Sequence, residues 1–188
     1  FMLDQEALLN FLYQANAKVT IVAKELVAAH YGRPAHHSYW VGCSTGGRQG
    51  LMAAQRFPED FDAIVAGAPA NNFGPLMALG VLAGNNVGGP NGIAVEKLAL
   101  LKEAAIKACD ATDGVTDRVI SDPARCGFDP VQLQCKGETS SQCLTATEVA
   151  AAKRVYAGVR DAKGEHVFPG TGFGSEPRWA AYASPGFR

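Results

Sequence analysis

The sequence predicts an α/β fold in which a parallel sheet is followed by a second region of helices and loops. The first observation is a short aromatic and β-branched run at 38–42, followed by a helical segment and a second apolar run at 62–67. Strand, helix and strand at this spacing are typical of two parallel strands joined by a crossover helix. The second observation is a change of composition after Ala70, first to Gly and Asn and later to a cysteine-rich segment. A domain boundary is expected there.

The first 70 residues contain the elements expected of the sheet region. A long helical pattern covers Asp4–Tyr31, with a possible break near Asn16 or in the β-branched run 19–22. Gly32 and Pro34 are typical of a helix end. The expected elements that follow are a strand at 38–42, a helix from Gly46 to Phe57, a turn at 58–60 and a buried strand at 62–67.

The region 71–188 is expected to be a separate, inserted domain. Residues 71–92 are rich in Gly and Asn, with an apolar insert at 76–82, and a helix is expected at 95–108. A further helix is expected at 145–159, because Thr145 and Glu148 have the spacing of a capping box. Residues 164–188 show no clear period, so no element is predicted for them.

The composition argues against two classes of partner. The 188 residues carry a formal net charge of −1, which gives no basic surface for nucleic acid. No apolar run approaches the roughly 20 residues that a membrane helix needs. We therefore expect neither nucleic acid nor membrane as a partner, and the sequence leaves the oligomeric state open.

A candidate nucleophile lies between the first predicted strand and the following helix. Gly42-x-Ser44-x-Gly46 is the nucleophile elbow of an α/β-hydrolase core when strand and helix flank it. Small residues on both sides of Ser44 avoid clashes in the strained turn. The backbone N–H of Thr45, at the helix N-terminus, would stabilise an oxyanion. The alternative is an ordinary Gly-Ser turn.

A serine nucleophile needs a base, and in this fold the order is serine, acid, histidine. His166 is the one histidine after Ser44, and no strand pattern precedes it. The triad therefore looks incomplete. In addition, Phe1-Met2-Leu3 does not resemble a signal peptide. We expect the chain to be an internal piece of a longer protein, inactive by itself.

Two further features concern a metal and disulfides. Three carboxylates, Asp110, Asp113 and Asp117, surround Gly114 in a loop at 110–122, and such hard oxygen donors suit Ca²⁺. The spacing is not that of an EF-hand, and the alternative is a solvated turn. The five cysteines contain no Cys-x-x-Cys pair. They indicate a disulfide framework of open connectivity and hence a secreted or periplasmic protein.

Residues 38–50 and 55–69 resemble the tannase and feruloyl esterase family, which includes hydrolases of mono-(hydroxyethyl) terephthalate. The resemblance covers most of the chain, and the adjacent Cys43 and Ser44 are its specific mark. Residues 110–126 resemble the family's calcium loop, and 168–179 resemble a lid segment. The resemblance implies a partial α/β-hydrolase core (1–70), part of a lid (71–188) and hydrolysis of a small aromatic ester through an acyl-Ser44 intermediate. Feruloyl, galloyl and terephthalate monoesters are the implied substrates.

The resemblance also implies roles for individual residues. Ser44 would be the nucleophile and the Thr45 N–H an oxyanion donor. Calcium would be bound by three side chains and two carbonyl oxygens: those of Asp110, Asp113 and Asp117, and of Val115 and Val119. The lid disulfides would be Cys109–Cys126 and Cys135–Cys143, and Cys43 would be unpaired here because its partner follows the catalytic histidine elsewhere. The alternative is a non-catalytic, calcium-stabilised binding module or an inactive fragment of the same fold.

Overall fold

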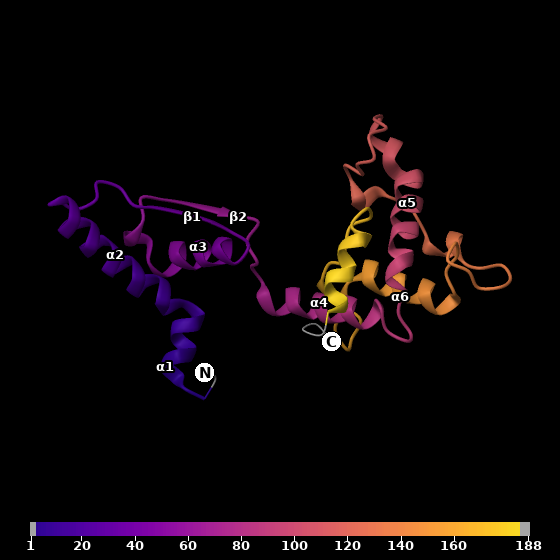
Figure 1. Ribbon diagram of the computed structural model, residues 1–188, viewed down its shortest axis with the longest axis horizontal. Coiled ribbons are helices and arrows are strands. Elements are labelled where there is room, and N and C mark those ends of the chain that lie inside the picture. The colour runs from indigo at the N-terminus through magenta and orange to yellow at the C-terminus, as the bar shows by residue number, and fades with distance from the viewer. Residues whose placement is uncertain (1–2, 185–188) are drawn as a thin grey trace. The chain divides into compact units, whose positions relative to one another are not determined.

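The computed structural model describes residues 3–184. The chain divides between Asn72 and Phe73 into two compact units. Figure 1 colours the first from indigo to magenta and the second from magenta to yellow. The assignment of these units to a hydrolase core and a lid, with the boundary expected after Ala70, stays a prediction.

The first unit begins with a helical segment and then alternates strand and helix. Its elements are α1 (Gln5–Leu9), a π-helical turn (Asn10–Gln14), α2 (Ala15–Tyr31), β1 (Tyr39–Cys43), α3 (Thr45–Arg56), a 3₁₀ turn (Pro58–Asp60) and β2 (Ala63–Gly67). The irregularity expected near Asn16 or at 19–22 lies earlier, at 10–14. A β-branched run costs a helix only a few tenths of a kcal/mol per residue, which is too little to break α2.

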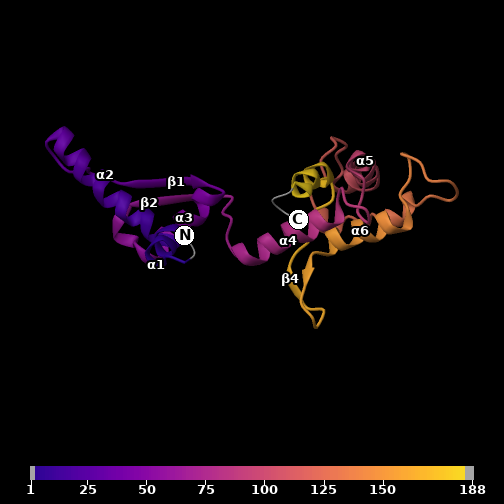
Figure 2. The ribbon, with the colours of Figure 1, turned by 60° about the horizontal axis from the view of Figure 1, so that its bottom comes forward.

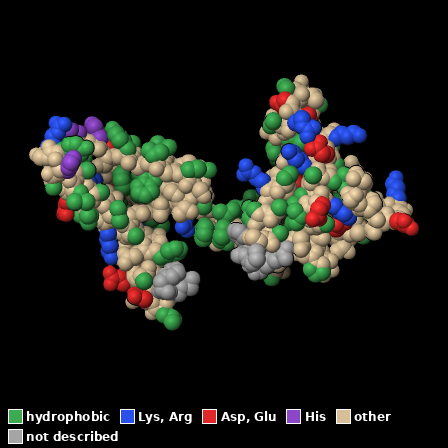
Figure 3. Space-filling model, viewed as in Figure 1, with side chains coloured by type: hydrophobic (Ala, Val, Ile, Leu, Met, Phe, Trp, Pro, Cys, Tyr) green, Lys and Arg blue, Asp and Glu red, His purple; other side chains and the backbone are tan. Residues whose placement is uncertain are grey.

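Strands β1 and β2 pair in parallel, with Tyr39 opposite Ala63 and Cys43 opposite Gly67. The parallel pair predicted from the strand–helix–strand spacing is therefore confirmed. Helix α3 contacts both strands and lies along them in Figure 2. On the other face, Val41 and Val65 are 78% and 60% exposed in the described part of the chain. Apolar side chains are correspondingly frequent on the visible surface of this unit (Figure 3).

The second unit is mainly helical. Its elements are α4 (Phe73–Asn86), a 3₁₀ turn (Val95–Lys97), α5 (Leu98–Cys109), 3₁₀ turns at Asp110–Asp113, Pro123–Arg125 and Pro130–Leu133, α6 (Ala146–Ala157), β3 (Val159–Arg160), β4 (His166–Phe168) and a 3₁₀ helix (Glu176–Ala183). The helix α4 was not predicted, and it covers most of the Gly- and Asn-rich segment 71–92. Burial of Leu79 and Ala83 outweighs the poor helix propensity of its glycines.

The segment without a predicted element also acquires structure. Gly158, at φ +77°, ends α6 two residues earlier than expected. An antiparallel hairpin of β3 and β4 follows, labelled at β4 in Figure 2. The final 3₁₀ helix buries Trp179 to 1% exposure in the hydrophobic core formed with α4, α5 and α6. Residues 185–188 of the expected irregular tail lie outside the described residues.

The expected capping box of α6 is present. The Thr145 hydroxyl accepts from the Glu148 N–H, and the Glu148 carboxylate accepts from the Thr145 N–H. Among residues 3–184, no helix has the length and apolar character that crossing a bilayer requires.

Candidate active site

Ser44 occupies the turn between β1 and α3, as the elbow pattern predicts. Its φ of +58° and ψ of −113° form a strained conformation that a residue other than glycine rarely adopts. Backbone hydrogen bonds hold it there. The Ser44 N–H donates to the Gly67 carbonyl (3.1 Å), and the Ser44 carbonyl accepts from the N–H groups of Arg48 (3.0 Å) and Ala70 (3.1 Å). Ser44 is an exposed residue in the described part of the chain.

The glycines around Ser44 differ in how closely they are packed. A Cβ on Gly42 would lie 2.5 Å from the Gly46 carbonyl oxygen, and a Cβ on Gly47 would lie 2.4 Å from the Gly67 carbonyl oxygen. A Cβ on Gly46 would meet no heavy atom within 4 Å in the described structure, apart from its chain neighbours and the nearby backbone of α3. The expectation that Gly46 is needed to avoid a clash is therefore wrong for this structure. Gly47 has that role, because α3 approaches the end of β2 there.

Thr45 is the first residue of α3, a helix of 12 residues. Its N–H is one of the donors that lack a partner within the helix at its N-terminus, where the helix dipole also favours negative charge. Such a donor beside the nucleophile is suited to the oxyanion of acyl transfer. No acidic residue in the first turn of α3 would oppose that charge.

A general base for Ser44 is not found in the described part of the first unit, where the serine hydroxyl makes no hydrogen bond. In that unit His37 lies 3.7 Å from a carboxylate oxygen of Asp62. The Ser38 N–H and then His37 hold the pKa of Asp62 below its ordinary value. In the second unit His166 lies in β4, where its Nε2 contacts Arg160 Nη2 at 2.5 Å.

The acidic loop folds around hydrogen bonds to its own backbone. Asp113 accepts from the Val115 N–H (2.9 Å) and from the Ser121 hydroxyl. The Ser121 and Val115 donors hold the pKa of Asp113 below its ordinary value. Asp117 accepts from the Val119 N–H (3.0 Å) and donates its own N–H to Asp110 (3.3 Å). Gly114, at φ +90°, permits the tight turn.

The chemistry of this loop favours a calcium ion, whereas the spacing of its side chains does not. Asp110 is only 7% exposed and forms no salt bridge within residues 3–184, and a buried carboxylate of that kind favours a cation. Carboxylates, and the carbonyl oxygens of exposed residues such as Val115 and Val119, are also the oxygen donors that calcium prefers. In the described residues, however, no three His, Cys, Asp or Glu side chains lie close enough together to hold a metal. The donor chemistry fits, and calcium binding stays a prediction.

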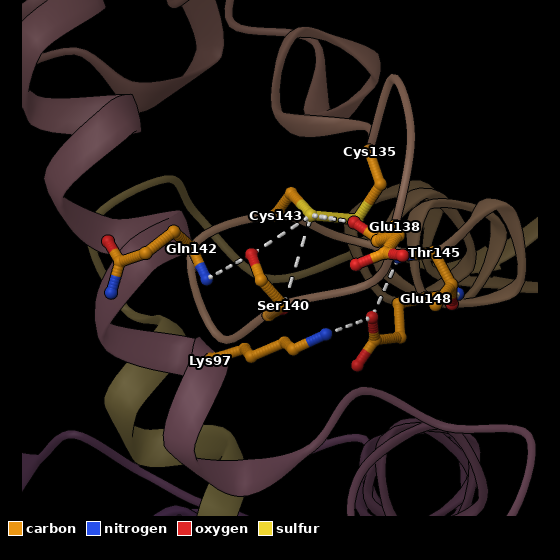
Figure 4. The surroundings of a disulfide bond; sticks show 8 residues. All are labelled: Lys97, Cys135, Glu138, Ser140, Gln142, Cys143, Thr145 and Glu148. Atoms are coloured by element: carbon orange, nitrogen blue, oxygen red, sulfur yellow. Dashed lines mark hydrogen bonds and ion pairs between the residues drawn. A yellow bond between two sulfur atoms is a disulfide. The ribbon is translucent and has the colours of Figure 1, made fainter.

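The structure contains the two disulfides that the resemblance implies, Cys109–Cys126 and Cys135–Cys143. Figure 4 shows the second one, which closes a polar loop beside the start of α6. Cys43 has a free, exposed thiol next to Ser44. The first disulfide joins the end of α5 to the segment after the acidic loop and so limits the spread of that loop.

One residue of the elbow was not predicted from the sequence. The Trp40 indole Nε1–H donates to the Gly46 carbonyl oxygen at 3.0 Å. The signal that could have revealed it is its position, two residues before Gly42, because alternate strand residues share a face. Trp40 and Gly42 therefore both face α3.

The family model described as tannase and feruloyl esterase matches residues 1–186. A protein named probable feruloyl esterase B-2 from Aspergillus flavus is 33% identical over 180 residues, which are 94% of this chain and 34% of that protein. A protein named mono(2-hydroxyethyl) terephthalate hydrolase from Piscinibacter sakaiensis is 34% identical over 193 residues, covering 89% of this chain and 32% of its own length.

The fold comparison agrees with the sequence comparison. The crystal structure of feruloyl esterase B from Aspergillus oryzae superposes with a TM-score of 0.85 and 34% identity, covering 95% of this chain and 37% of that one. The predicted α/β-hydrolase class, present as part of a larger core, is thereby confirmed. The chain spans about a third of the length of these relatives.

Proposed function

Because this chain belongs to the tannase and feruloyl esterase family, we propose that it carries the nucleophile of a serine carboxylic-ester hydrolase. The single observation that carries the proposal is the conformation of Ser44. A non-glycine residue at φ +58° is held between a strand and a 12-residue helix, with its side chain exposed. Strain of this kind persists where the surrounding structure enforces it, and it is common at reactive residues.

In the proposed reaction, the Ser44 hydroxyl is the nucleophile and the Thr45 N–H is an oxyanion donor. The Ser44 Oγ attacks the ester carbonyl carbon and gives its proton to a general base. The carbonyl oxygen becomes an oxyanion, which the Thr45 N–H stabilises by a hydrogen bond. When this intermediate collapses, the ester C–O bond breaks and the alcohol leaves with the proton that the base returns, so that an acyl-Ser44 ester remains. Water then attacks that ester, and the acid is released with regeneration of the Ser44 hydroxyl.

The proposed substrates are esters of small aromatic acids. Relatives are named probable feruloyl esterase B-2 and mono(2-hydroxyethyl) terephthalate hydrolase, and both names denote enzymes that act on esters of an aromatic carboxylic acid. Feruloyl, galloyl and terephthalate monoesters are therefore the compounds to test. The rate at which the whole protein releases the acid from each ester, measured by chromatography, would rank these substrates.

We further propose that calcium cross-links the acidic loop. The side chains of Asp110, Asp113 and Asp117 and the carbonyls of Val115 and Val119 would hold it. The ion would supply positive charge next to the buried Asp110 and so stabilise the loop. With two disulfides in the second unit, an oxidising compartment, outside the cell or in a periplasm, is the proposed location.

The decisive experiment for the nucleophile uses the whole protein and a fluorophosphonate. We expect one equivalent to react, the adduct to map to the peptide with Ser44 and esterase activity to be lost in parallel. The Ser44→Ala variant should neither react nor hydrolyse esters. Full inactivation with an adduct on another serine would refute the assignment. An unreactive protein that melts normally and responds to calcium would favour the binding module instead.

A further inference from the structure

We propose that Trp40 is a positioning residue for the nucleophile elbow and acts through its hydrogen bond to the Gly46 carbonyl. The inference rests on the proposed function, because Ser44 is the group that is positioned. The bond joins the strand that precedes Ser44 to the helical turn that follows it. It therefore closes a loop of backbone with Ser44 and Thr45 inside.

The indole lies in a space that only glycines provide. A Cβ on Gly42 would come within 2.8 Å of Trp40 Nε1, and a Cβ on Gly50 would lie 2.9 Å from both Nε1 and Cδ1 of the same indole. Gly42 lies in β1, before Gly46, whose carbonyl oxygen accepts the indole hydrogen bond. Gly50 lies in α3, one turn after Gly46. The absence of side chains at both positions lets the indole lie between β1 and α3. The ring of Phe61 packs edge-on against it, with centroids 5.6 Å apart.

The first turn of α3 needs such a contact because it is rich in glycine. Gly46 and Gly47 follow Thr45 directly. Glycine has more backbone freedom than any other amino acid. Backbone hydrogen bonds fix the N–H and carbonyl of Ser44 itself. The indole fixes the next part of the turn, at the Gly46 carbonyl. Together these contacts set the direction of the Thr45 N–H relative to the serine oxygen.

A positioning role makes a different prediction from a packing role. Loss of the indole N–H should slow the chemical step, since small errors in the placement of reacting groups reduce rates strongly. Substrate binding, by contrast, should change little. The matched pair of variants is Trp40→Phe, which removes the donor and keeps an aromatic ring, and Phe61→Leu. The second loosens the same packing and leaves the hydrogen bond.

The experiment measures acylation in the whole protein, from the pre-steady-state burst of p-nitrophenol with a p-nitrophenyl ester in excess over the enzyme. We expect Trp40→Phe to lower the acylation rate about tenfold, on the scale of one lost hydrogen bond, and to leave the pH profile unchanged. The substrate dissociation constant, taken from the dependence of the burst rate on substrate concentration, should stay within about twofold. Phe61→Leu should lower the melting temperature and keep the acylation rate. Equal rates for Trp40→Phe and wild type, or equal losses in both variants, would overturn the proposal.

A second readout does not depend on turnover. In a ¹⁵N-tryptophan sample of the whole protein, the indole signal that disappears in Trp40→Phe is assigned to Trp40. We expect the Trp40 indole proton to exchange slowly with solvent and to shift when Ser44 is labelled by fluorophosphonate. Rapid exchange of the Trp40 indole proton, with no shift of its signal after labelling, would contradict the positioning role. If Ser44→Ala retained esterase activity, the proposed function would fail while the slow exchange remained. If Ser44→Ala were inactive and Trp40→Phe fully active, only the positioning role would fail.

Discussion

Lys97 Nζ lies 2.7 Å from Glu148 Oε2, in a salt bridge whose side chains are 13% and 9% exposed. The pair joins the start of α5 to the first turn of α6 (Figure 4). Glu148 also accepts from the N–H groups of Thr145 and Ala94. One carboxylate therefore caps α6 and holds the segment before α5, which makes it a sensitive point of the second unit.

Replacement of this carboxylate should be costly. Glu148→Gln would leave Lys97 buried without a counter-charge, and we expect a loss of about 3 kcal/mol in the free energy of unfolding. Glu103→Gln is the matched control, because Glu103 pairs with Arg118 at the surface. It should change stability little. Urea denaturation of both variants measures the difference, and equal losses would contradict the prediction.

The same salt bridge predicts a dependence on pH. Burial raises the pKa of Glu148, but the Lys97 ammonium and the Thr145 and Ala94 N–H groups outweigh it and hold that pKa below its ordinary value. A lowered folded-state pKa contributes stability above the unfolded-state value of about 4.3, and the contribution is lost as pH falls through the folded-state pKa. The stability gap between wild type and Glu148→Gln should therefore narrow from pH 6 towards about pH 3. A constant gap would exclude the charge as its cause.

Gly47 should not tolerate a side chain, although it lies in a glycine-rich turn. Gly47→Ala places a Cβ 2.4 Å from the Gly67 carbonyl oxygen and 2.9 Å from Cα of Pro69, both backbone atoms that cannot move aside freely. We expect α3 to shift from β2, with a loss of stability of about 2 kcal/mol and of Ser44 reactivity. Gly137→Ala is the control, because its Cβ would meet nothing within 4 Å. Fluorophosphonate labelling and melting of both variants test this, and unchanged behaviour of Gly47→Ala would refute it.

Calcium should stabilise the protein through the acidic loop. At a hundredfold excess over Kd, a bound ion adds about 2.7 kcal/mol, so a chelator should lower the melting temperature by several degrees. The Asp110→Asn variant should have a lower melting temperature than wild type without chelator, and chelator should not lower it further. Asp122→Asn, in the same loop and outside the proposed ligand set, should respond to chelator like wild type. An unchanged wild-type midpoint, together with no calcium by elemental analysis, would count against the site.

The cysteine pairing predicts one reactive thiol in the 188-residue chain. After denaturation without reductant, iodoacetamide should modify Cys43, and peptide mapping should find Cys109–Cys126 and Cys135–Cys143 intact. Removal of the first disulfide by Cys109→Ala with Cys126→Ala should cost about 3 kcal/mol in the chain-entropy model. A disulfide from Cys43 to any of the other four would disprove the pairing.

The sequence alone determined the features that depend on neighbouring residues. The strand before Ser44, the helix after it and the parallel partner strand follow from periodicity and spacing, and the structure agrees. The capping box of α6 was equally readable, because its two residues are three positions apart. Such signals are local, and tertiary packing strengthens them without changing them.

The tertiary structure decided what depends on residues far apart in the chain. Helix α4 forms in a Gly- and Asn-rich segment because Leu79 and Ala83 find a buried environment that the local sequence does not show. Gly47 has no room for a side chain because the end of β2, 20 residues later, lies against it. Trp40 reaches the Gly46 carbonyl because the chain reverses direction at Ser44. Periodicity gives the face on which a side chain lies, whereas the atom it meets depends on how the elements pack.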